Sequence, residues 1–269
     1  MSTVTQILYF TLKESVVPES PTNDPGRLFS EVVCAARCLF GYIKSCWSRT
    51  LEKENDIVWI IEWKETERPE DNIRRFPMCL ITSCLEFETM VFPYYATFTP
   101  SLSVNLLEAP VLEIKLLLFP RELDSADTSR LWDNLFHFRT ECLHLTGCAP
   151  ATGMSIGSVR WPDTTYTAPV DTGPRQARMV VILTGWGSRA EQGAAEKSEQ
   201  FRNAMEPLKA MMLPADPFLR PRHIQIRWPD SPERQIPEME SSESSESSES
   251  SESSESSESE DPGTETLPN

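Results

Sequence analysis

The residues of this sequence that could transfer protons lie on predicted strands. His223 begins a short apolar strand, and an imidazole titrates near neutral pH, so His223 is a candidate general acid or base. Glu62 and Glu113 each alternate with apolar residues, and burial can raise the pKa of such a carboxyl until it acts as a base. The alternatives are a structural histidine and carboxylates that form ion pairs between parts of the chain or lie at an exposed rim.

Three tryptophans are candidates for binding a planar substrate. Trp63 and Trp186 each end a predicted strand, and Trp59 lies on the same face as Trp63. An indole ring offers a large rigid surface on which an aromatic molecule can stack. The alternative is that all three are large core residues.

One helix carries residue types that bind metals. His137, Glu141 and His144 are spaced i, i+4, i+7, and two histidines with a carboxylate can hold iron or zinc. This face is opposite the apolar stripe of the same helix, so we expect it to be solvated. The sequence therefore predicts no metal site, and no cofactor.

The hydrophobic pattern predicts the same order of elements twice. In the first copy, Asn23 or Asp24 caps a helix that begins at Pro25, and the strands and second helix are expected at 3–13, 42–49, 57–64, 68–85 (helical, interrupted by Pro77) and 94–99. In the second copy, Asp124 or Ser125 caps a helix through Leu145, and the other elements are expected at 111–119, 154–161, 178–186, 188–212 (helical, disturbed near Pro207) and 223–228. The order βαββαβ, repeated, is the ferredoxin-like pattern of an α+β fold.

The predicted strand 57–64 is apolar on both faces. Trp59 and Trp63 face one way, and Val58 and Ile60 face the other. Two-sided burial indicates that a second sheet covers the face that the helices leave open. We therefore predict that the two ferredoxin-like halves, 1–102 and 103–230, form one intramolecular, pseudo-dimeric α+β barrel, followed by a tail at 231–269.

The repeat, a glycine before the second strand of each copy (Gly41 and Gly153) and the tryptophan ending the third strand together resemble the dimeric α+β barrel superfamily. The likeness covers residues 3–228 and is greatest to tandem fungal proteins of the antibiotic-biosynthesis-monooxygenase type. This superfamily includes cofactor-free oxygenases, haem-degrading enzymes, cyclases, decarboxylases and proteins of no known activity.

The resemblance also implies which site residues to look for. Quinone-forming members pair the tryptophan with an asparagine four residues earlier, where this sequence has Trp59 and Ile182. Haem-degrading members place a histidine about ten residues after it, where this sequence has Ile73 and Glu196. Neither half keeps these polar partners.

Charge separates the tail from the rest of the chain. The whole chain carries −16 and residues 231–269 carry −11, so residues 1–230 carry −5. No basic region offers itself to nucleic acid, and no apolar run reaches the ~18 residues of a membrane span. The N-terminus does not read as a signal peptide, and the seven cysteines include no Cys-x-x-Cys pair, so we expect a cytoplasmic protein with reduced thiols.

The tail alternates Ser-Ser-Glu and has almost no apolar residues, so we predict that it is disordered. Ser257 lies three residues before Glu260, which suits an acid-directed kinase. Phosphorylated Ser257 would then lie three residues after Ser254 and direct its modification in turn. The alternative is a solubilising tail with no fixed role.

Two functions are consistent with these features. The first is a cofactor-independent enzyme that oxygenates, cyclises or decarboxylates a small aromatic or polyketide molecule in fungal secondary metabolism, as a monomer or weak homodimer. It predicts a cavity of about 300 Å³ or more with converging polar groups. The second is a non-catalytic small-molecule-binding or scaffold protein whose acidic, phosphorylated tail engages a basic partner.

Overall fold

All described residues lie within Met1–Pro229. In the computed structural model, the described residues are 3–20, 22–64, 81–86, 92–161, 164–167, 174–214 and 221–226. The predicted tail and most of the predicted helix 68–85 lie outside these ranges. No described helix is long and apolar enough to cross a membrane.

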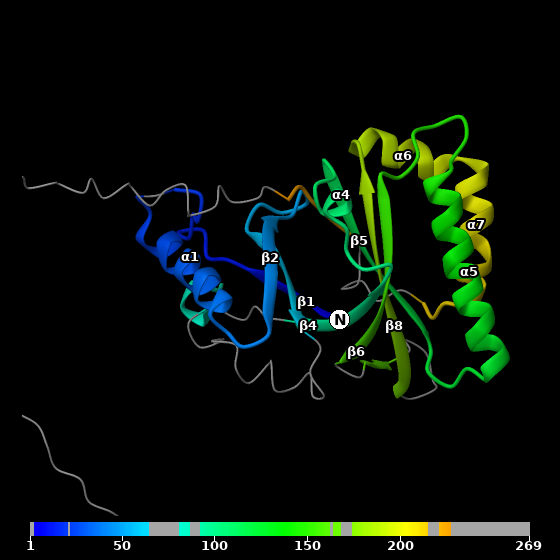
Figure 1. Ribbon diagram of the computed structural model, residues 1–269, viewed down its shortest axis with the longest axis horizontal. Helices are drawn as coiled ribbons and strands as arrows, with labels where there is room; N and C mark the ends of the chain where they lie inside the picture. Colours follow the sequence, from blue (N-terminus) through cyan, green and yellow to red (C-terminus); the bar gives the residue numbers. More distant parts are fainter. Residues whose placement is uncertain are drawn as a thin grey trace, which may run out of the picture. The chain divides into compact units, whose positions relative to one another are not determined.

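Two similar series of elements follow one another along the chain (Figure 1). The first series is β1 (Thr3–Thr11), α1 (Asp24–Arg37), β2 (Tyr42–Arg49), β3 (Asp56–Lys64), a 3-10 turn (Thr82–Cys84) and β4 (Phe92–Thr99). The second is α4 (Val104–Leu107), β5 (Val111–Pro120), α5 (Ser125–Leu143), β6 (Gly153–Trp161), β7 (Thr164–Thr167), β8 (Pro174–Trp186), α6 (Arg189–Lys197), α7 (Glu199–Met211) and β9 (Arg222–Ile224).

The strands form one antiparallel sheet that closes on itself. Its order is β2-β3-β1-β4-β6-β8-β5-β9, with β7 paired to β8. The two ends meet where Thr50 bridges to Ile224 and the Leu51 amide donates to the His223 carbonyl at 2.7 Å. Each half contributes four strands in the ferredoxin-like order, so the predicted α+β barrel is confirmed.

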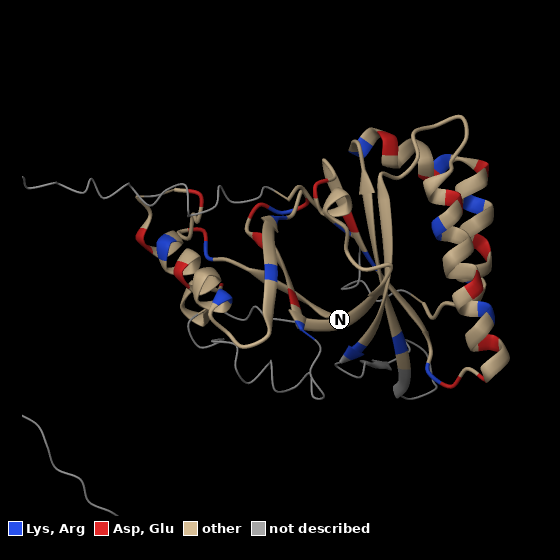
Figure 2. Ribbon diagram, viewed as in Figure 1, with Lys and Arg blue, Asp and Glu red and all other residues tan. Residues whose placement is uncertain are grey.

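Three cores explain why the strands are apolar on both faces. The outer face of the first sheet, including Trp59 and Trp63, packs against α1, and the outer face of the second sheet packs against α5 and α7. The inner faces of both sheets meet in a third core, which contains Val58 and Ile60. Outside, acidic and basic residues are interspersed along α1, α5 and α7 (Figure 2).

The helix starts agree with the capping chemistry. The Asn23 side chain accepts from the Gly26 amide at 2.6 Å, and Asp124 accepts from the Asp127 amide at 2.6 Å. Such caps satisfy amides that have no partner inside the helix. Among the described glycines, Gly41 and Gly147 have positive φ (84° and 76°), so the counterpart of Gly41 after the helix is Gly147 and not Gly153.

Two predicted boundaries were wrong, and one strand was not predicted. The helix 188–212 is broken at Ser198, which leaves the helical conformation and caps α7, whereas Pro207 lies inside α7. The last strand covers three residues, Arg222–Ile224. Finally, part of the connection after β6 is ordered as β7, which pairs with the early part of β8.

Candidate acid–base site of the second half

Three of the predicted site residues come together between the second sheet and α6. On β5, Glu113 lies opposite His223 of β9. Trp186 of β8 lies opposite Val111, which is two residues before Glu113 on β5. The Trp186 indole N–H donates to Glu113 Oε2 at 3.3 Å, and His223 Nε2 lies 3.9 Å from Glu113 Oε1. All three side chains are buried. Antiparallel pairing therefore brings together residues that are 37–110 positions apart in the sequence.

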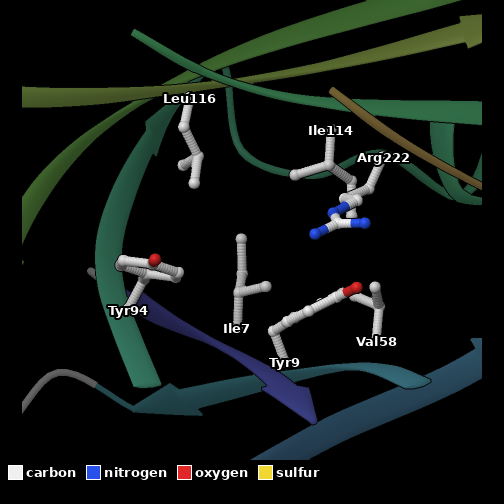
Figure 3. Close-up of a pocket in the computed structure, with 7 residues that line it drawn as sticks. All are labelled: Ile7, Tyr9, Val58, Tyr94, Ile114, Leu116 and Arg222. Carbon is white, nitrogen blue, oxygen red and sulfur yellow. The ribbon is translucent and has the colours of Figure 1, made fainter. Parts of the chain in front are cut away.

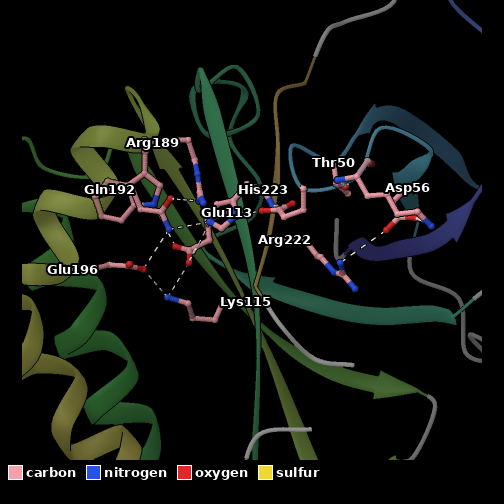
Figure 4. Close-up of polar contacts among 12 residues, drawn as sticks. Thr50, Asp56, Glu113, Lys115, Arg189, Gln192, Glu196, Arg222 and His223 are labelled. Atoms are coloured by element: carbon pink, nitrogen blue, oxygen red, sulfur yellow. Dashed lines mark hydrogen bonds and ion pairs between the residues drawn. The ribbon is translucent and has the colours of Figure 1, made fainter. Parts of the chain in front are cut away.

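The imidazole of His223 is held at both nitrogens (Figure 4). Its Nδ1 contacts Glu52 Oε1, and its backbone amide donates to Glu52 Oε2 at 3.1 Å. Its Nε2 lies 2.9 Å from the amide nitrogen of Gln192 on α6. Since Glu52 follows β2, the first half of the chain supplies one wall of a site in the second half.

These contacts fix the tautomer of His223. Arg189 donates to Gln192 Oε1 at 2.7 Å, so the other end of that amide is the NH₂ group, which can only donate. His223 Nε2 must therefore accept from Gln192, and Nδ1 carries the proton that faces Glu52. The same NH₂ group also donates to Glu196 at 3.3 Å.

Lys115 supplies the positive charge of the cluster. Its Nζ lies 2.9 Å from Glu113 Oε1 and 3.5 Å from Glu196 Oε1, and 5.8 Å from the centre of the Phe201 ring. Burial opposes the charge of Lys115, but Glu113 and then Glu196 outweigh it and raise the pKa of the lysine. Lys115 thus remains an ammonium and holds Glu113 in an ion pair.

The first half has an uncharged version of this arrangement. Trp63 lies opposite Val4, and Val4 is two residues before Gln6 on β1. In the same way, Trp186 lies opposite Val111, and Val111 is two residues before Glu113 on β5. The Trp63 indole N–H donates to Gln6 Oε1 at 2.9 Å.

The next strand continues the correspondence. Tyr95 lies opposite Gln6, as His223 lies opposite Glu113. Along β1, Leu8 occupies the position that Lys115 has along β5.

The remaining predicted site residues lie elsewhere. Trp59 and Trp63 are buried in the core under α1, where Trp59 packs near Phe29. Glu62 lies on the inner face of β3, where its Oε1 is 3.4 Å from Lys44 Nζ. Burial raises the pKa of Glu62, and Lys44 lowers it by less. The predicted tryptophans and carboxylates therefore do not share one pocket.

The site also contains residues that sequence reasoning missed. Glu52 lies in a short loop, and Gln192 on an amphipathic helix, and nothing local in the sequence marks either of them. Glu196 is marked only by the resemblance, since it occupies the position at which the resemblance predicts a histidine.

Comparison with known proteins identifies the fold. No family model matches the chain, and no curated protein matches it. A solved structure of an anthrone oxidase-like protein has a TM-score of 0.51 at 10% identity, over 84% of this chain and 92% of that one. A structure assigned as a chlorite dismutase has a TM-score of 0.50 at 12% identity, over 84% and 95%. This chain has the fold of the dimeric α+β barrel superfamily. A mutant chlorite dismutase from Candidatus Nitrospira defluvii is also similar, with a TM-score of 0.48 at 9% identity over 83% and 92%.

The interior of the α+β barrel contains a small cavity (Figure 3). It lies on the opposite face of β5 and β9 from His223, and Arg222 points into it. Its water-accessible volume is about 40 Å³, which is below the size expected for a drug-sized substrate. Within the described residues no group of three or more His, Cys, Asp or Glu side chains is arranged to bind a metal, and Glu141 is instead hydrogen bonded to Gln200 at 2.6 Å.

Proposed function

We propose that this protein is an enzyme that acts on a small aromatic molecule by general acid–base chemistry, without a cofactor, at the cluster around His223. The observation that carries the proposal is the pairing of the buried imidazole with Glu52 through Nδ1. A carboxylate in this position fixes the tautomer and stabilises the imidazolium that forms when Nε2 takes a proton. The proposal requires the substrate to displace the Gln192 amide from Nε2.

The other residues have supporting roles in this proposal. Glu113 lies 3.9 Å from Nε2 and adds negative charge near the imidazolium, while Lys115 and Trp186 hold that carboxylate in place. Glu62 has no part, because it pairs with Lys44 on the inner face of β3. Of the three tryptophans proposed to bind substrate, only Trp186 belongs to this cluster.

The reaction class follows from what an imidazole base can do. It can remove a proton from a carbon acid that is activated by conjugation with an aromatic ketone, and the resulting carbanion can react with dioxygen. Anthrone is a suitable probe, since one of the similar structures is named an anthrone oxidase-like protein. The balanced reaction is anthrone plus O₂ giving anthraquinone plus water.

The test is oxygen uptake and quinone absorbance with the full-length protein, anthrone and air. We expect His223→Asn to lower the catalysed rate by about 10²- to 10⁴-fold, the usual contribution of a general base. His137→Asn, which changes an exposed histidine of α5, is the matched control and should not alter the rate. A His223→Asn enzyme as fast as the wild type would contradict the proposed role.

A second function is favoured by the tight packing of the site. Both nitrogens of His223 are already occupied, and the barrel cavity is small. In this alternative, the barrel is a scaffold, and the acidic tail at 231–269 binds a basic partner after phosphorylation of Ser257 and then Ser254. Mass spectrometry of protein treated with an acid-directed kinase tests the order, because Ser257→Ala should also prevent modification of Ser254.

A further inference from the structure

The cavity inside the barrel lies where the two halves face each other. Because the sheet registers align the halves, Ile7 corresponds to Ile114 and Tyr94 to Arg222. Both members of each pair line the cavity, together with Val58 and a third pair, Tyr9 and Leu116. The cavity thus spans the pseudo-twofold axis, but its two ends differ: one end has Arg222 and Tyr9, and the other has Tyr94 and Leu116.

Arg222 points its guanidinium into this cavity (Figure 3). The guanidinium lies over the Tyr9 ring, 4.7 Å from its centre, and the side chain is 29% exposed. Within the described part of the chain, no acceptor lies within hydrogen-bond distance of the guanidinium, and the nearest carboxylate oxygen, Asp56 Oδ2, is 3.9 Å away. A planar cation with five donors is therefore positioned at one end of an apolar space.

Asp56 does not need Arg222 as a partner. Its Oδ2 accepts from the Tyr9 hydroxyl at 2.6 Å, its Oδ1 accepts from the Thr11 hydroxyl at 2.6 Å, and Lys53 Nζ lies 3.4 Å from Oδ1. The N–H donors of Arg222 therefore stay available for a further planar acceptor.

We propose that the barrel interior binds a short-chain carboxylate, with its carboxylate on Arg222 and its apolar body between Ile7 and Ile114. A guanidinium donates two parallel hydrogen bonds to a carboxylate, which matches a planar anion better than a spherical one. A single buried water needs about 10–15 Å³, so a 40 Å³ space holds about three water-sized groups. The ligand is therefore a carboxylate of about three or four non-hydrogen atoms, such as formate or acetate.

This site is separate from the acid–base cluster. Arg222 and His223 are neighbours on β9 and point to opposite faces of the sheet, one into the barrel and the other toward α6. The carboxylate site thus adds a ligand-binding position to the one that the proposed function uses, and its test does not depend on enzymatic turnover.

The experiment compares acetate with its neutral isostere acetamide, using calorimetry and NMR on the full-length protein. We expect the carboxylate to bind and the amide to bind at least tenfold more weakly. Arg222→Gln should lower the affinity for the carboxylate at least tenfold, and Arg222→Lys should give an intermediate value, because it keeps the charge but loses the planar fork. Arg202→Gln, which removes an arginine from the exposed face of α7, is the matched control and should bind as the wild type does.

A second variant tests the location of the binding site and leaves the charge of Arg222 unchanged. Leu116→Phe fills the end of the cavity opposite Arg222 and should also prevent binding. Thermal melts of each variant without ligand confirm that it is folded. Equal binding of acid and amide, wild-type affinity in Arg222→Gln, unchanged binding in Leu116→Phe, or no binding by the wild type would each overturn the proposal.

Discussion

The two halves of the barrel place different chemistry on the same positions. The first half has Gln6, Trp63 and Tyr95 where the second has Glu113, Trp186 and His223. In both halves the indole N–H donates to the side chain two positions along the neighbouring strand. Only the second half, however, buries charges at these positions.

This difference indicates what the charges are for. The neutral set in the first half demonstrates that the same framework packs without any buried ion pair. A buried ion pair is weak evidence for stability, because the cost of desolvating both groups offsets much of their attraction. The proposed function gives these charges a role beside His223, and four experiments examine the comparison of the two halves.

The largest expected effect comes from removing one charge of the second half. Glu113→Gln leaves Lys115, which is 13% exposed, with Glu196 as its remaining carboxylate partner. We expect the free energy of unfolding to fall by about 3 kcal/mol, as is usual when one member of a buried pair is lost. Urea unfolding measures it. The corresponding change in the first half, Gln6→Glu, should also destabilise the protein. A fully stable Glu113→Gln protein would show that Glu196 alone compensates the charge of Lys115.

The second effect is the recovery expected when both charges are removed together. Glu113→Gln combined with Lys115→Leu installs the Gln and Leu of the first half, so neither charge of the buried pair is left alone. Glu196, which is 40% exposed, keeps its hydrogen bond from Gln192. The double variant should regain most of the lost stability, with a coupling energy of about 2 kcal/mol in a double-mutant cycle. Additive losses would mean that the two halves differ in packing as well as in charge.

A smaller effect concerns Glu62, whose counterpart in the second half is Gly185. Burial raises the pKa of Glu62 above its unfolded value, so folding favours its protonated form. That contribution is complete below the unfolded pKa of about 4.3 and is lost as the pH rises through the folded pKa. Glu62→Gln should therefore be more stable than the wild type between pH 4 and pH 7. The gain should be at most about 1 kcal/mol, because solvent around the partly exposed Lys44 screens the charge of Glu62.

Thermal melts across this pH range check the Glu62 prediction. Glu108→Gln, at an exposed position, is the control. A gain that is the same at every pH would show that the effect of the substitution is not due to titration of Glu62.

The smallest expected effect is that of the tail. Deleting residues 231–269 removes no part of the described barrel, so the melting temperature should be unchanged within error. Anthrone turnover should also be unchanged if the barrel is the working part. A tailless protein that is stable but loses its cellular role would instead favour the scaffold function.

The sequence predicted those parts of the fold that depend on neighbouring residues. The alternation of β3 located both of its buried faces, and the caps Asn23 and Asp124 marked two helix starts. The break of the last long helix was misplaced, because the capping serine at 198 had a stronger local effect than Pro207.

The site was less predictable for two physical reasons. Both faces of β5 are apolar, so alternation could not tell whether Glu113 points into the barrel or toward the helices. The partner of His223, Glu52, is 171 residues away and is brought there only by closure of the sheet. Local patterns carry no information about such a contact.

The barrel can close only late in the synthesis of the chain. Thr50, at the end of β2, pairs with Ile224, so this pairing can form only after 174 further residues have been added. At about 5–20 residues per second, this takes roughly 9–35 s. Within that interval, after β4 is complete at Thr99, the inner face of the first sheet, with Val58 and Ile60, has no second sheet to cover it. A nascent chain of this protein therefore passes through a stage in which an apolar sheet is open to other chains and to chaperones.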